Sequence, residues 1–353
     1  MSPGAPLARD ARLLLRLPAW VGDLVMAEPL VRALAAHLEG GELTLAGAAR
    51  HLALLEERFV RARRVDPADP AAWRGHDAAL LCTGSFRSAW RAFRAGIPRR
   101  IGFARDGRAW LLTDAPVPAR ERGATPLGLG RAGGGRRYLP RPLERSLAEL
   151  AGLVGVAVRD PRPRLEVREG WRARARARRA ELGLAPEEPF LLASVGARPG
   201  SAKGLPPERW RAVLAPLARA SGLPLLLLAA PGEEAAQAAL AATCPGARSV
   251  RAPAADLPEL AAHCAEARLV LCADSGARHV ARAVGAAVAC VAGPTDPRHA
   301  AGERGDEVLL RTTVPCGPCH RERCPLPAAE ALRCWHELDV EQVLSAARAA
   351  LAR

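Results

Sequence analysis

The chain has 353 residues, which is more than one ordinary domain contains and suits two domains. Hydrophobic residues make up 49% of the sequence and charged residues 25%, a balance that excludes a disordered chain. Its apolar runs all fall short of the about 18 residues that a membrane span needs, and its start lacks a signal-peptide pattern, so we expect a cytoplasmic protein.

The chain is strongly basic, with 51 Lys and Arg against 37 Asp and Glu and a net charge of +14. This charge predicts an anionic partner, either nucleic acid or a negatively charged membrane surface. Only 4% of the residues are aromatic, and no nucleic-acid recognition motif is present. We therefore expect an anionic membrane surface and no nucleic acid, with drift toward arginine as the alternative explanation.

The first half alternates apolar segments with helical patterns, which predicts a parallel sheet covered by helices. The segments expected to be strands are Arg12–Leu17, Glu42–Ala46, Ala78–Cys82 and Arg100–Phe103, and the expected helices are Leu24–His37 and Ser146–Leu153. Residues 123–142 are rich in Gly, Arg and Pro, which predicts a loop.

The second half repeats the alternation. The expected strands are Phe190–Ser194, Leu223–Ala229, Leu269–Ala273 and Ala287–Ala292, and the expected helices are Gly170–Leu182, one from Glu208, and Val340–Leu351. The sequence thus predicts an α/β protein of two doubly wound domains, residues 1–165 and 166–353. Ligands of such sheets bind beyond the carboxyl ends of the strands, so we expect the site in a cleft between the domains.

The turn after the first expected strand carries Trp20, Gly22 and Asp23. Asp23 lies at or beside the start of the following helix, where the positive end of the helix dipole favours an ionised carboxylate. Two interpretations fit this position. Asp23 is either a helix cap, for which aspartate is a preferred residue, or a catalytic base.

Three strand ends in the second half carry groups suited to an anion: Ser194–Lys203, Asp274–His279 and Gly293–Asp296. Ser275 and Gly276 open a helix whose free backbone N–H groups can bind a phosphate. Lys203 is the only lysine among the 51 basic residues, which suits a site that needs a compact ammonium group. Together these features favour a phosphate-bearing ligand over simple helix capping.

Four of the nine cysteines are clustered near the C-terminus, at Cys316, Cys319, Cys324 and Cys334. This spacing fits a structural zinc site, although it contains only one close C-x-x-C pair. Zinc and unliganded thiols are equally consistent with the pattern. The other five cysteines are expected to be small buried hydrophobic residues.

In combination, these segments resemble the family 9 glycosyltransferases, the lipopolysaccharide heptosyltransferases, and among them heptosyltransferase II most of all. The matching pieces occur in family order: Pro18–Pro29, Gly84–Trp90, Ala95–Phe103, Gly200–Trp210, Cys272–Gly285, Gly293–Pro297 and Cys316–Pro325. Two positions depart from the family, which often has Asn in place of Gly84 and Ala273. Since neither position is charged, the departures affect fine substrate contacts more than the reaction.

The resemblance implies a GT-B architecture, in which two Rossmann-like domains face each other across a cleft. It also implies transfer of a heptose, with inversion, from ADP-L-glycero-D-manno-heptose to a heptosyl-Kdo-lipid A acceptor in the lipopolysaccharide inner core. Asp23 matches the general base, and we expect Lys203 to share in catalysis. The expected donor-binding residues are Ser194, Gly196, Lys203, Glu233 (with Glu234 as its alternative), Asp274, Ser275, Gly276, His279 and Thr295.

The N-terminal domain is expected to hold the lipid-linked acceptor, through Trp20, Gly22, Ser85, Arg87, Arg99 and Arg100. Lys203 and the N–H groups of Ser275 and Gly276 would carry the charge of the leaving ADP, so we expect no catalytic metal. The basic surface would rest on the inner face of the inner membrane as a peripheral contact. The alternatives are a related sugar-nucleotide transferase with another donor or acceptor, and a basic module that only binds nucleic acid or membrane.

Overall fold

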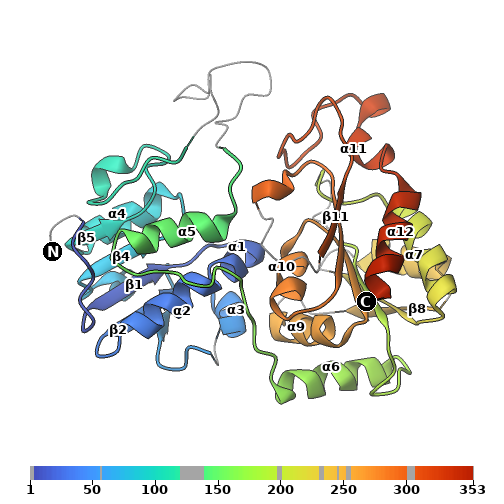
Figure 1. Ribbon diagram of the computed structural model, residues 1–353, viewed down its shortest axis with the longest axis horizontal. Coiled ribbons are helices and arrows are strands. Elements are labelled where there is room, and N and C mark those ends of the chain that lie inside the picture. The colour runs from blue at the N-terminus through green and yellow to red at the C-terminus, as the bar shows by residue number, and fades with distance from the viewer. Residues whose placement is uncertain are drawn as a thin grey trace. The chain divides into compact units, whose positions relative to one another are not determined.

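The chain forms two compact units (Figure 1), Met1–Pro163 with Arg298–Gly302, and Arg164–Pro297 with Glu303–Arg353. The structure is a computed structural model that describes residues 4–55, 58–119, 139–196, 201–229, 234–244, 246–251, 256–299 and 307–352. Each unit contains one parallel sheet covered by helices, which confirms the predicted α/β class with two parallel-sheet domains. The assignment of residues 1–165 to the acceptor and 166–353 to the donor stays a prediction.

The sheet of the first unit has the order β3-β2-β1-β4-β5, with every pair parallel. Its strands are β1 (Arg12–Arg16), β2 (Glu42–Ala46), β3 (Arg63–Val65), β4 (Ala78–Leu81) and β5 (Arg99–Ile101). Its helices are α1 (Val21–Met26), α2 (Glu28–His37), α3 (Ala49–Leu52), η1 (Ala53–Leu55), η2 (Pro70–Trp73), α4 (Phe86–Arg94), η3 (Ala109–Leu111) and α5 (Leu143–Gly152). Three consecutive leucines of β1, residues 13–15, are fully buried, because helices cover both faces of a central parallel strand.

The single helix expected over Leu24–His37 is two helices. The first begins three residues earlier than predicted, and the chain turns at Ala27 before α2 starts with Pro29 in its first turn. Proline lacks the backbone N–H that would continue α1, and its fixed φ suits a new helix start. Asp23 is therefore the third residue of α1, and Trp20 is its N-cap.

The sheet of the second unit has the order β11-β10-β9-β6-β7-β8, again parallel throughout. Its strands are β6 (Leu191–Ser194), β7 (Leu225–Ala229), β8 (Ala247–Arg251), β9 (Leu269–Ala273), β10 (Val288–Ala292) and β11 (Glu307–Arg311). Its helices are α6 (Glu169–Glu181), α7 (Pro207–Ser221), α8 (Glu234–Thr243), α9 (Leu257–Glu266), α10 (Gly276–Ala283), η5 (Ala328–Glu330), α11 (Arg333–His336) and α12 (Val340–Leu351). The short η4 (Pro297–His299) begins in this unit and continues into the segment assigned to the first unit. Buried side chains form a core on each face of this sheet.

The order of the strands marks a switch point in each sheet, where the chain leaves neighbouring strands in opposite directions. In the first unit this point lies between β1 and β4, and in the second between β6 and β9. Open α/β sheets bind ligands at the carboxyl ends of the strands beside such a point. The segments after β1, β4, β6, β9 and β10 are therefore where a ligand is expected. Among the described residues, no helix has the length and apolar character to cross a membrane.

Candidate active site

Asp23 lies in the turn that follows β1, at the switch point of the first sheet. Its neighbour Gly22 is buried, Asp23 itself is half-buried, and Trp20 is 60% exposed. Trp20 occupies the N-cap position of α1 and Asp23 the third helical position, so Asp23 is not the N-cap residue. As the acidic residue of the first turn, its charge is favoured by the helix dipole, which suits a carboxylate that must stay ionised.

Ser85 and Arg87 follow β4 at the same edge of the sheet. The backbone N–H of Cys82, just past β4, donates to the carbonyl of Arg16 at the end of β1 (3.0 Å), so the two segments leave the sheet side by side. Ser85 is the N-cap of α4 and is exposed, as is Arg87. Asp23, Ser85 and Arg87 therefore lie at the same edge of the first sheet, and their contact with an acceptor stays a prediction.

Arg99 has a structural role instead of the predicted contact with the acceptor. Its side chain is fully buried, and its guanidinium forms two hydrogen bonds to the carboxylate of Asp114 (3.1 and 3.2 Å). It also donates to the carbonyls of Ala5 and Leu153. Arg100 is half-buried, donates to the carbonyls of Leu111 and Ile97, and is occupied in the same way.

Two cations at this edge, the buried Arg108 and the half-buried Arg16, were missed from the sequence. Arg108 is 1% exposed, and it donates to the carbonyls of Phe103 (3.0 Å) and Ser85 (3.3 Å). Burial lowers its pKa to about 10. Burial also lowers the pKa of Arg16, which donates to the carbonyl of Ala46. They were missed because a sequence pattern does not tell a buried arginine from an exposed one.

In the second unit, the expected donor residues gather at one edge of the sheet. Ser194 ends β6 and pairs in register with Cys272 of β9, while Gly196 lies two residues further on. Asp274 follows β9, and its N–H donates to the carbonyl of Val291 in β10 (3.2 Å). Ser275 then caps α10 with extended backbone and without a side-chain cap bond. This edge therefore combines serine hydroxyls, a helix start and a carboxylate.

Asp274 belongs to a buried network of charges. Its carboxylate accepts a hydrogen bond from Arg278 (2.7 Å), and Arg278 also pairs with Glu307 of β11. Burial raises the pKa of Asp274, but Arg278 and the Thr295 hydroxyl together outweigh burial and lower it. Arg278 is itself fully buried. Asp274 is therefore held ionised and fixed in position.

His279 lies beside this network and is almost fully buried. Burial is the main cause that lowers its pKa to about 3, and Arg278 adds to the effect. Its imidazole is therefore neutral at physiological pH. A neutral imidazole can donate or accept a hydrogen bond at a ligand hydroxyl, but it offers no charge to a phosphate.

Lys203 lies on a turn that two distant residues hold in place. The N–H of Ala202 donates to the carbonyl of Glu322, and the carbonyl of Ala202 accepts from the indole of Trp335 (2.8 Å). Lys203 itself is exposed, and its N–H donates to the Ser201 hydroxyl (3.3 Å). The backbone is thus fixed while the ammonium group can reach a ligand.

Trp335 is a third residue that the sequence did not reveal. Its ring is 1% exposed and lies against Gly293, where a Cβ atom would come within 2.4 Å of the ring. Only glycine fits this position without a clash. Trp335 therefore contacts both turns: its indole binds Ala202 in the turn of Lys203, and its ring packs on Gly293 in the turn that carries the buried Thr295. The contact joins residues far apart in the chain, so a local pattern does not contain it.

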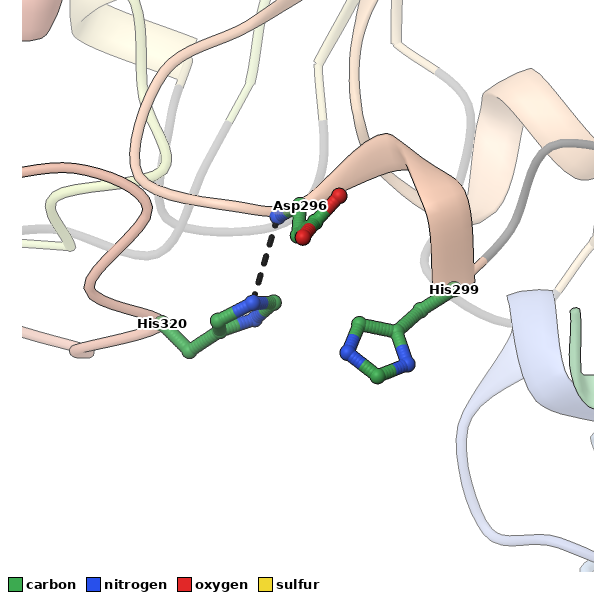
Figure 2. A group of neighbouring side chains, drawn as sticks. All are labelled: Asp296, His299 and His320. Atoms are coloured by element: carbon green, nitrogen blue, oxygen red, sulfur yellow. Dashed lines mark hydrogen bonds between the residues drawn. The ribbon is translucent and has the colours of Figure 1, made fainter. Parts of the chain in front are cut away.

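Glu233 lies outside the described residues, whereas its alternative Glu234 opens α8. Among the described residues, one group has metal-ligand atoms that all lie within 4.8 Å of one another, namely Asp296, His299 and His320. Figure 2 shows that the backbone N–H of Asp296 already points to Nε2 of His320, at 3.3 Å. This contact engages one of the two His320 nitrogens that could bind a metal.

The four clustered cysteines lie near one another without forming such a group within the described ranges. Burial is the main cause that raises the pKa of Cys334 to about 11, and the other three thiols raise it further. The sulfur of Cys324 accepts a hydrogen bond from the N–H of Leu332 (3.3 Å). The thiols would have to move together to bind one zinc ion, so the zinc stays a prediction.

Comparison with known proteins identifies one family. The family model described as glycosyltransferase family 9 (heptosyltransferase) matches residues 137–330, which is more than half of the chain. The matched segment contains Lys203, Asp274 and the Gly293 turn. A search of curated proteins gives no match.

Solved structures share the fold over nearly the whole chain. ADP-heptose lps heptosyltransferase II of E. coli is 21% identical, with a TM-score of 0.71 over 97% of this chain and 98% of that one. A family 9 glycosyl transferase of Veillonella parvula is 16% identical, with a TM-score of 0.76 over 98% and 99%. E. coli heptosyltransferase WaaC, solved with ADP-2-deoxy-2-fluoro heptose, is 18% identical, with a TM-score of 0.60 over 86% and 93%. These similarities confirm the GT-B fold.

Proposed function

Because the chain belongs to glycosyltransferase family 9, the heptosyltransferase family, we propose that it transfers a heptose from ADP-L-glycero-D-manno-heptose to the lipopolysaccharide inner core. The chain is a glycosyltransferase. The proposed acceptor is a heptosyl-Kdo-lipid A, and the anomeric configuration of the sugar inverts. The donor assignment is supported by WaaC of E. coli, which has been solved with an ADP-heptose analogue and shares the fold.

The observation that carries the proposal is the edge of the second sheet. Three neighbouring strands meet there: Ser194 ends β6, the start of α10 follows β9, and the buried Thr295 follows β10. Backbone N–H groups at a helix start bind phosphate, and the exposed Lys203 supplies a compact positive charge. An edge with this chemistry suits the diphosphate of a nucleotide sugar.

In the proposed mechanism, Asp23 removes a proton from the acceptor hydroxyl as that oxygen attacks the anomeric carbon. The bond from that carbon to the diphosphate oxygen breaks, and negative charge develops on the leaving ADP. Lys203 and the N–H groups of Ser275 and Gly276 stabilise that charge, with no need for a catalytic metal. The ionised, fixed carboxylate of Asp274 accepts hydrogen bonds from sugar hydroxyls.

Transfer assays test the proposal directly. Purified protein is incubated with ADP-heptose and with Kdo-lipid A acceptors of increasing core length, and the product is detected by mass spectrometry. The proposal expects transfer to the singly heptosylated acceptor. Transfer from a UDP- or GDP-sugar instead, or to an acceptor outside the lipopolysaccharide core, would assign the chain to a related transferase.

A separate measurement tests the zinc predicted for the cysteine cluster. Elemental analysis of the purified chain, combined with titration of reactive thiols, counts the zinc ions and the free cysteines. About one zinc per chain, released when the thiols are modified, would support a structural site. Full reactivity of Cys316, Cys319 and Cys324 with no zinc present would show unliganded thiols.

A further inference from the structure

Four aromatic side chains form an exposed row on the first unit. Phe86, Trp90 and Phe93 of α4 are 43%, 39% and 44% exposed, and Trp110 of η3 is 64% exposed. Ring centroids lie 6.2 Å apart for Phe86 and Trp110, 6.4 Å for Phe93 and Trp110, and 5.9 Å for Trp90 and Phe93. The chain contains only five Phe and seven Trp, so this aromatic patch holds a large share of them.

Helix α4, labelled in Figure 1, buries small residues and leaves large apolar side chains partly exposed. A helix that covers a sheet normally turns its large apolar side chains inward. In α4 the buried residues are the small Ser88, Ala89 and Ala92, while the three aromatic side chains face solvent. Packing against the sheet therefore does not explain the aromatic residues.

The patch is surrounded by positive charge. The guanidinium of Arg94 lies over the ring of Trp90 (5.9 Å), and that of Arg100 lies over Phe93 (5.5 Å). Arg87 is exposed on the same helix, which contains no acidic residue. Within the part of the chain that the structure describes, neither Arg87 nor Arg94 has a carboxylate partner.

We propose that the aromatic patch docks the enzyme on an anionic lipid bilayer. Tryptophan and phenylalanine side chains are stable at the boundary between headgroups and acyl chains, and arginines beside them attract anionic headgroups. Nucleic acid fits less well, because bases stack on free ring faces, and Trp90, Phe93 and the two arginines cover one another. The inference rests on the proposed function for its biological purpose, because docking on the bilayer would bring Ser85 and Arg87 to a lipid-linked acceptor.

Vesicle co-sedimentation of the full chain tests the proposal. The chain is expected to bind vesicles of phosphatidylcholine with one third phosphatidylglycerol, and to bind pure phosphatidylcholine far less. Phe93→Ser combined with Trp110→Ser should weaken binding roughly tenfold or more, since two large side chains no longer enter the bilayer. Val60→Ser is the matched control, because Val60 is 71% exposed in the same unit and lies outside the patch.

Quenching by brominated lipids locates the contact. Tryptophan fluorescence of the unaltered chain should fall when it binds anionic vesicles that contain bromolipid. Trp90→Phe combined with Trp110→Phe keeps an aromatic patch and should still bind, but most of the quenching should be lost. Vesicle binding by the Phe93→Ser, Trp110→Ser variant that equals binding by the unaltered chain would overturn the proposal. Undiminished quenching in the Trp90→Phe, Trp110→Phe variant would overturn it as well.

Two further measurements separate this inference from the proposed function. Transfer to a soluble, delipidated acceptor should be unchanged in the double serine variant, whereas transfer to acceptor embedded in vesicles should fall. If the unaltered chain does not bind ADP, the proposed function is refuted, whereas the proposal of vesicle docking is unaffected. The membrane proposal would also be overturned if the unaltered chain bound single-stranded DNA and not vesicles, and the Phe93→Ser, Trp110→Ser variant bound that DNA more weakly. That result would assign the patch to nucleic acid.

Discussion

Asp23 combines two properties that a general base needs, a partly accessible carboxylate and a helix start that favours its charge. Asp23→Asn should therefore lower kcat by a factor of roughly 10² to 10⁴, the usual contribution of a general base, while ADP binding is unchanged. Steady-state kinetics and calorimetric titration with ADP check the two parts. Near-normal turnover in this variant would remove Asp23 from the mechanism.

Lys203 is the residue for which a change of shape at constant charge is most informative. A planar guanidinium does not replace a compact ammonium group at a diphosphate, so Lys203→Arg should reduce kcat/KM by roughly tenfold. Arg209→Lys is the matched control, since Arg209 is held by the carbonyl of Leu338. Kinetics equal to those of the unaltered chain would mean that the single lysine is accidental.

At the scale of elements, Trp335 joins the turns that carry Lys203 and Thr295. Trp335→Phe keeps most of the buried ring but removes the hydrogen bond to Ala202, at a cost of about 1 kcal/mol of stability. The Lys203 turn should then be less well fixed, so we expect KM for the donor to rise more than kcat falls. A fall in kcat with an unchanged KM for the donor would contradict this positioning role.

The elements that the sequence predicted well are those whose buried residues follow a local pattern of apolar residues in the sequence. β2, β9 and α12 have the predicted bounds, because apolar runs and a 3.6-residue period mark them. The edge strands β3, β8 and β11 were missed, since edge strands such as β3 carry charged residues that a strand pattern excludes. At the site, the turns and the helix start were predicted, whereas contacts such as Trp335 with Gly293 were not. Those contacts depend on tertiary packing.

At the scale of the whole molecule, buried histidines make stability depend on pH. Burial lowers the pKa of His51, His76 and His279, that of His279 to about 3. Below a pH of about 6.5 the unfolded chain therefore binds protons that the folded chain does not, and stability falls as the pH falls. Each such histidine contributes up to about 1.4 kcal/mol per pH unit.

Thermal unfolding between pH 7 and pH 5 measures this dependence. The midpoint should fall by roughly 3 to 6 °C per pH unit for each buried histidine that stays neutral. His279→Gln should make the dependence shallower, whereas His336→Gln, at an exposed position, should leave it unchanged. An identical pH dependence in the His279 variant would show that His279 is not the neutral, buried group described above.

The central claim is that the carboxyl edge of the second sheet binds the diphosphate of an activated sugar. A crystal structure of the chain with ADP-heptose, or with a non-transferable analogue, tests it most directly. The account predicts diphosphate oxygens within hydrogen-bond distance of the N–H groups of Ser275 and Gly276, with the ammonium group of Lys203 beside them. A nucleotide bound anywhere else, with these groups facing only solvent, would contradict it.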